Sequence, residues 1–212
     1  MRDFPLFTTE NGVGSLVLRE IPYRGNAYIT IRDSQTPEEF LTECVAFCTV
    51  AGAKDIYATG HSVLEQYPLY TRVIRMSADT SAIPETDVSV FPVTEKTVKR
   101  WTEIYNEKMK TVHNASYMSE RDHGELLKTA GAYFIHRDGN LIGIGMVADD
   151  RIECVASCVQ GGGRDVVLAL MHILMCDRVT LDVASTNDKA IRLYESLGFV
   201  PVTEVSRWYK II

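Results

Sequence analysis

Two periods of hydrophobic and polar residues alternate along the 212-residue chain. Residues 14–21, 27–33, 55–61 and 70–77 have the alternation typical of strands. Residues 36–52 instead carry apolar side chains at helical spacing, with Thr36 and Pro37 marking the start and Gly52 following the end. The first part of the chain is therefore predicted to be a small module of strands and one helix.

A second module is predicted after residues 77–86, whose Ser, Thr, Ala and Pro content is typical of a connector. A strand over 87–93 precedes an amphipathic helix over 95–112, for which Thr94 is the expected cap. Residues 132–150 read as a hairpin that turns at Asp138 and Gly139, a pair suited to a tight turn. This gives predicted domains at 1–85 and 86–212.

The last third of the chain switches to an alternating strand and helix pattern. Strands are expected over 151–159, 178–185 and 199–212, with helices over 166–175 and 187–197 between them. A strand, crossover helix and strand imply a parallel pair inside an otherwise antiparallel sheet, so the fold class is mixed α/β with flanking helices. Because residues 27–77 repeat this order weakly, the first module is interpreted as a degenerate copy of the second.

Composition and charge limit the classes of partner. The chain is 46% hydrophobic. No apolar run approaches the length of roughly 20 residues that crosses a bilayer, so we expect a soluble, cytoplasmic protein without a membrane partner. The net charge of -6 argues against nucleic acid and mildly favours a neutral or cationic partner. Five cysteines, an odd number, favour reduced thiols.

A glycine-rich loop is the first chemical signal. It connects the strand at 151–159 with the helix at 166–175 and contains three consecutive glycines, Gly161 to Gly163. Glycines let the backbone approach a ligand, and free amides at a helix start bind anions such as phosphate. The loop matches neither the dinucleotide fingerprint nor the P-loop. A turn that only joins strand to helix is the alternative.

The second signal is the stretch LDVASTNDKAIRLYESLGF, and together with CVASCVQGGGRD it resembles the coenzyme-A-binding half of the Gcn5-related N-acetyltransferases. Gln160 and Gly163 match the family's Q/R-x-x-G-x-G/A loop. The helix motif N-x-x-A-x-x-L-Y-E-x-x-G-F is matched throughout, by Asn187, Ala190, Leu193, Tyr194, Glu195, Gly198 and Phe199. The resemblance is greatest to the branch that acetylates alanine N-termini of ribosomal proteins. Its motifs cover residues 155–199, and it does not extend to the first module, over 1–85.

This resemblance implies a sheet with a splayed parallel strand pair and acetyl-coenzyme A as co-substrate. The implied coenzyme-binding residues are Cys154, Val155, Gln160, Gly161, Gly162, Gly163, Arg164, Asp165 and Asn187. Tyr194 is the implied general acid for the thiolate leaving group. Asp182 is the first candidate for the general base and Glu153 the second.

Each implied role has a structural alternative. Asn187 also suits a helix cap, Tyr194 a core position, and Asp182 a salt-bridged strand carboxylate. Asp165 departs from the family, which has glycine or alanine there. A carboxylate about 5 Å from a phosphate costs roughly 3 kcal/mol at an effective dielectric near 20. A binding or regulatory protein with this fold is therefore the alternative to an enzyme.

The acceptor and the assembly are less defined by the sequence. The resemblance implies a primary amine, on a small molecule or a peptide. We expect residues 113–117, the hairpin and the first module to select it. The closing strand is a candidate for pairing in a homodimer. Zinc is disfavoured, because Cys154 and Cys158 lie about 13 Å apart on a strand, whereas structural zinc usually uses close pairs in turns.

Overall fold

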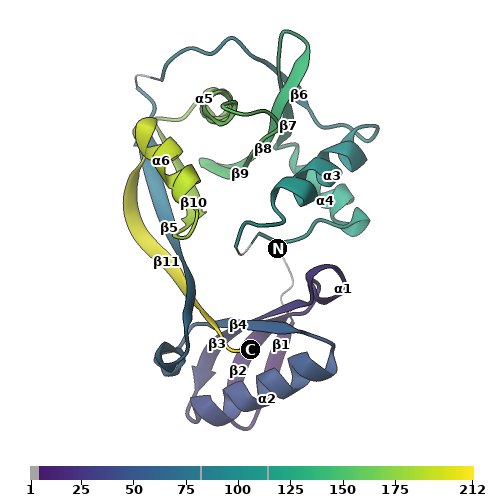
Figure 1. Ribbon diagram of the computed structural model, residues 1–212, viewed down its shortest axis with the longest axis vertical. Helices are drawn as coiled ribbons and strands as arrows, with labels where there is room; N and C mark the ends of the chain where they lie inside the picture. Colours follow the sequence, from purple (N-terminus) through teal and green to yellow (C-terminus); the bar gives the residue numbers. More distant parts are fainter. Residues whose placement is uncertain (1–4, 82, 114) are drawn as a thin grey trace. The chain divides into compact units, whose positions relative to one another are not determined.

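The computed structural model describes residues 5–81, 83–113 and 115–212 (Figure 1). The chain divides into two compact units, one of residues 1–73 with 204–212 and one of residues 74–203. The sequence instead placed a boundary at residues 77–86 and assigned the whole C-terminal end to the second domain. In the structure, the end of the last strand belongs to the first unit.

The first unit is a sheet with one long helix. Its strands follow the order β1-β2-β3-β4-β11-β5, and helix α2 packs on the sheet through Phe40, Leu41, Cys44 and Cys48. Its elements are β1 (Leu6–Thr9), β2 (Gly12–Val17), α1 (Ile21–Arg24), β3 (Asn26–Ser34), α2 (Pro37–Val50), β4 (Asp55–Thr59), η1 (Ser62–Gln66), the start of β5 (Leu69–Asp79) and the end of β11 (Val200–Lys210).

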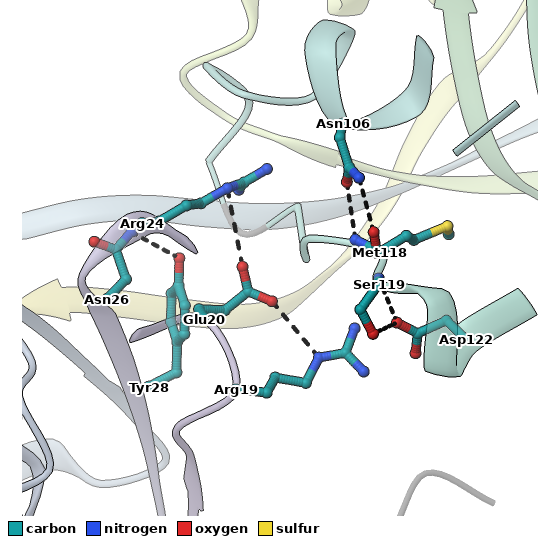
Figure 2. Close-up of polar contacts among 9 residues, drawn as sticks. All are labelled: Arg19, Glu20, Arg24, Asn26, Tyr28, Asn106, Met118, Ser119 and Asp122. Atoms are coloured by element: carbon teal, nitrogen blue, oxygen red, sulfur yellow. Dashed lines mark hydrogen bonds and ion pairs between the residues drawn. The ribbon is translucent and has the colours of Figure 1, made fainter. Parts of the chain in front are cut away.

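Polar contacts order the segment around α1 (Figure 2). Glu20 is buried, with Arg19 Nε at 3.6 Å and Arg24 Nε at 3.9 Å from its carboxylate. On β3, the Asn26 side chain lies 3.5 Å from the Tyr28 hydroxyl. Ion pairs at this range add little stability when exposed, but burial of Glu20 makes the two arginines its necessary counter-charges.

The second unit is the other part of the same sheet, with helices on both faces. Its strands follow the order β5-β10-β9-β8-β7-β6. One hydrophobic cluster joins the sheet to α5 and α6, and another joins it to α3 and α4. The elements are β6 (Ser89–Pro92), α3 (Val98–Lys108), η2 (Glu120–Asp122), α4 (His123–Thr129), β7 (Ala132–Arg137), β8 (Asn140–Ala148), β9 (Arg151–Ser157), α5 (Gly163–Leu174), β10 (Arg178–Ala184) and α6 (Asp188–Ser196).

The mixed α/β fold class is confirmed, and the predicted hairpin is present. β7 and β8 are antiparallel. The turn residues Asp138 and Gly139 have φ values of 50° and 77°, as a two-residue hairpin turn requires. The start of α3 was predicted wrongly. Helix α3 begins at Val98 and its N-cap residue is Thr97, because residues 95–97 form a turn in which Thr97 Oγ1 accepts from the Thr94 amide at 2.9 Å.

Side-chain hydrogen bonds hold Met118 and Ser119, which directly precede η2. The Asn106 amide donates to the Met118 carbonyl at 2.7 Å and accepts from the Met118 N–H at 2.9 Å (Figure 2). Ser119 and Asp122 form a reciprocal capping box at the start of η2.

Among the described residues, no helix combines the length and apolar character that crossing a membrane requires.

Candidate functional site

β9 and β10 form a wedge within the second unit. The two parallel strands, both fully described, pair only where Arg151 meets Thr180 and Ile152 meets Leu181. Beyond these pairs β9 continues to Ser157 and β10 to Ala184. The edge of β9 that faces β10 therefore offers unpaired backbone groups to a ligand.

A β-bulge explains the separation of the strands. On the other side of β9, Cys154 pairs with Met146 and Ile152 pairs with Val147, which leaves Glu153 as an extra residue. A bulge bends its strand and reverses which face the following side chains occupy. Accordingly, Ile152 packs in the cluster with α5 and α6, whereas Cys154 packs in the cluster with α3 and α4. Nothing in the sequence pattern had indicated this bulge.

The glycine-rich loop places free amides beside the wedge. Gly161 has a φ of 82°, a conformation that favours glycine. Helix α5 begins two residues later, at Gly163. The first bond from the helix to its cap runs from the Val166 amide to the Gly162 carbonyl at 3.1 Å. The amides of residues 163–165 precede it and point out of the helix start, which is an anion site.

Gly162 is closely packed against side chains of the strand and loop before it. A Cβ atom at this buried position would lie 2.8 Å from Val159 Cγ2 and 3.1 Å from Ser157 Oγ. A side chain would therefore require Val159 and Ser157, which flank the loop that carries the amides, to move. Gln160 and Arg164, at the two ends of the loop, are exposed and available to a ligand.

The Asp165 carboxylate is paired. Arg137 on β7 donates to its Oδ1 from Nη2 at 2.8 Å. From the sequence, a negative charge that the neighbouring Arg164 offsets only in part was expected under the phosphate site. Because Arg137 lies on the hairpin, far from Asp165 in sequence, no local pattern could have identified the partner.

Helix α6 places Asn187 and Tyr194. The Asn187 Oδ1 accepts from the Ala190 amide at 3.2 Å. Asn187 therefore caps the helix, and its own amide group is left as a donor. The Tyr194 ring lies 5.8 Å from the Phe199 ring, and the residue is 9% exposed. Tyr194 thus lies in the core rather than in bulk water.

The Tyr194 hydroxyl interacts electrostatically with Cys154 of β9. Burial first, and then the Cys154 thiol, raise the pKa of Tyr194 above its usual value of 10. The hydroxyl therefore carries its proton at neutral pH. Burial, followed by the negative charge of Glu153, raises the pKa of the Cys154 thiol to about 12. Cys154 is therefore not a thiolate nucleophile.

The two candidate bases differ in their surroundings. Asp182 Oδ1 accepts from Arg75 Nε at 2.8 Å, and Oδ2 accepts from Arg75 Nη2 and Arg151 Nη1, both at 3.0 Å. Glu153, on the bulge, has one guanidinium nitrogen of Arg151 at 3.4 Å and stays exposed. Both oxygens of Asp182 are thus engaged, while Glu153 retains free acceptor positions.

The first unit has neither the wedge nor the loop among its described residues. Its parallel strands β3 and β4 pair at successive residues from Asn26–Asp55 to Thr30–Thr59. Helix α2 begins with Pro37, which has no N–H, followed by Glu38 and Glu39. Acidic residues in the first turn disfavour an anion there. The candidate coenzyme site therefore lies in the second unit.

Comparison with known proteins supports this architecture. No family model matches the chain, and no curated protein matches it. Solved structures do. A GCN5-related N-acetyltransferase from Kribbella flavida has a TM-score of 0.58 at 15% identity, and the match covers 99% of this chain and 89% of that chain. The chain has the Gcn5-related acetyltransferase fold.

Two further solved structures match the chain. A GCN5-related N-acetyltransferase from Anabaena variabilis has a TM-score of 0.63 at 12% identity, over 94% of this chain and 59% of that chain. A conserved protein of unknown function from Staphylococcus epidermidis has a TM-score of 0.61 at 11% identity, over 99% and 94% of the two chains. These matches extend over both units.

Proposed function

We propose that the second unit binds acetyl-coenzyme A and transfers its acetyl group to a primary amine. The observation that carries this proposal is the wedge between β9 and β10, which the glycine-rich loop and the start of α5 follow in the chain. The buried Tyr194, which interacts electrostatically with Cys154 of β9, supports it. A wedge of unpaired strand edge accommodates an extended amide chain, and a glycine-rich helix start accommodates a pyrophosphate.

In this proposal the loop and strand β9 hold the coenzyme. The amides of residues 163–165 bind the pyrophosphate, with Gln160 and Arg164 as side-chain donors. The backbone of Cys154 and Val155 pairs with the pantetheine, and the free amide group of Asn187 donates to it. Arg137 offsets the charge of Asp165, so the departure from the family pattern is compatible with phosphate binding.

Transfer then proceeds directly in a ternary complex. The amine nitrogen forms a bond to the acetyl carbon while the bond from that carbon to sulfur breaks. The amide near Val155 stabilises the oxygen on which negative charge develops. Tyr194 donates its proton to the departing sulfur, and Glu153 accepts the proton of the amine, directly or through one water molecule. Because the Cys154 thiol is protonated, no acyl-cysteine intermediate is proposed.

A binding or regulatory protein is the second candidate. The engagement of Asp182 by Arg75 and Arg151 favours it, since Asp182 was the first-ranked base. The exposed Glu153 on the bulge provides another carboxylate for the reaction. Within the enzyme proposal, one acceptor specificity is the acetylation of protein N-termini, as in the ribosomal-protein branch.

Two variants distinguish which carboxylate, that of Glu153 or that of Asp182, is the general base. We expect Glu153→Gln to lower kcat for thiol release about tenfold, because a general base is lost while water replaces it in part. Asp182→Asn should lower thermal stability, because it removes the negative partner of two half-buried guanidinium groups, with less than a threefold loss of kcat in the folded protein. The reverse pattern of kcat values would assign the base to Asp182.

A further inference from the structure

A row of alternating charges lies across β5, β10 and β9 of the second unit. Arg75 on β5 binds Asp182 on β10, which binds Arg151 on β9, whose Nε is 3.4 Å from Glu153. The side chains are between 22% and 35% exposed. Arg151 lies where β9 and β10 still pair, and Asp182 and Glu153 directly follow the second residue pair, where the wedge opens.

Three members of the row, Arg75, Arg151 and Glu153, have unused hydrogen-bonding capacity. Arg75 directs Nε and Nη2 at Asp182, and Arg151 directs Nη1 at Asp182 and Nε toward Glu153. These contacts do not use Nη1 of Arg75 or Nη2 of Arg151. Guanidinium groups bind carboxylates with fixed, directional geometry. Glu153 keeps free acceptor positions for an ammonium group.

An acceptor whose charges all have the same sign does not complement the row electrostatically. The hydrogen bond to Asp182 raises the pKa of Arg75, and Asp150 and Glu153 add to this effect, so both carboxylates lie within electrostatic range of Arg75. A polyamine would bring only positive charge to the two arginines. An acceptor with only an anionic group would meet Asp150 and Glu153. A molecule that carries both charges complements the row.

We propose that the acceptor is a zwitterionic amine of the free amino acid class, a proposal that rests on the proposed function. Its carboxylate binds the remaining donors of Arg75 and Arg151, and its ammonium group approaches Glu153, which takes the proton before attack. Arg75 and Arg151 are then specificity-determining residues. If the row only holds the strands together, acceptors with and without a carboxylate will react equally well.

The test uses matched acceptors with acetyl-coenzyme A and follows thiol release. Leucine, lysine and glutamate are compared with their α-amides, and leucine also with isoamylamine, which lacks the carboxyl group. In the best series we expect kcat/KM for the amino acid to exceed that for its amide at least tenfold, because the lost contacts are charge-assisted hydrogen bonds. Arg75→Gln should reduce this ratio to below about threefold, mainly through KM.

Controls separate recognition from folding. Arg100→Gln on α3, whose 68%-exposed side chain pairs with Glu103, should keep the ratio. Arg75→Lys keeps the charge and should retain part of the ratio, and it replaces Arg75→Gln if the latter does not fold. The dissociation constant of acetyl-coenzyme A, measured by calorimetry, should change less than twofold in both Arg75 variants.

The outcomes distinguish the two proposals. Absence of acetyl-coenzyme A binding contradicts the proposed function itself. Binding with equal transfer to amino acids and amides, or with no transfer to any amino acid, overturns the zwitterion proposal. A preference that survives Arg75→Gln unchanged also overturns the assignment to this row.

Discussion

Replacing Tyr194 by phenylalanine is expected to lower kcat for acetyl transfer about a hundredfold, since a positioned general acid contributes 10²–10⁴-fold. The buried phenol is protonated at neutral pH and interacts with Cys154 on the strand that lines the wedge. The substitution removes one oxygen atom and keeps the ring that packs on Phe199. The dissociation constant of acetyl-coenzyme A should therefore stay within about twofold.

Stopped-flow or steady-state measurement of thiol release, combined with calorimetry, checks both numbers. Tyr133→Phe is the matched control, because Tyr133, on β7, packs against the same hydrophobic cluster as Tyr194 and has no proposed role in transfer. Its kcat should change less than twofold. Turnover of Tyr194→Phe equal to that of the unchanged protein would remove the acid role from Tyr194.

Replacing Arg137 by alanine is expected to weaken acetyl-coenzyme A binding about tenfold. Arg137 is the partner of Asp165, and without it an unpaired carboxylate remains in the first turn of α5 beneath the proposed pyrophosphate site. Repulsion between the two negative charges is then screened only by solvent and salt, which limits the expected loss to this range.

The double variant Arg137→Ala/Asp165→Asn identifies the cause. Removal of the carboxylate should restore the affinity to within about threefold of that of the unchanged protein, a coupling that a double-mutant cycle measures. The single Asp165→Asn variant should bind at least as tightly as the unchanged protein. If the double variant binds as weakly as Arg137→Ala alone, Arg137 contacts the coenzyme itself and the compensation argument is wrong.

Features with local signals were predicted well from the sequence. The hairpin followed from Asp138 and Gly139, whose conformations few other pairs adopt easily. The crossover from β9 through α5 to β10 followed from hydrophobic periodicity. The cap at Asn187 and the left-handed Gly198, with a φ of 86°, followed from helix-end chemistry. These features depend on residues that are close in sequence.

Features that depend on distant partners were not predicted. The bulge at Glu153 arises from register with β8, and the pairing of β11 with β4 joins Tyr209 to Ala58. The partner of Asp182, Arg75, is 107 residues away in the chain. The sequence therefore identified both candidate bases but carried no information about which of them is engaged by arginine.

The central claim, that the wedge and glycine loop of the second unit bind acetyl-coenzyme A, is tested most directly by calorimetric titration of two variants beside the unchanged protein. Gly162→Val should weaken binding at least tenfold, because a branched side chain there must displace Val159 and Ser157 beside the loop, whereas Gly124→Ala, with open space at its Cβ, should retain it. For the unchanged protein we expect one site with a dissociation constant on the order of 10 μM. No heat at millimolar acetyl-coenzyme A, or equal binding by folded Gly162→Val, would contradict the account.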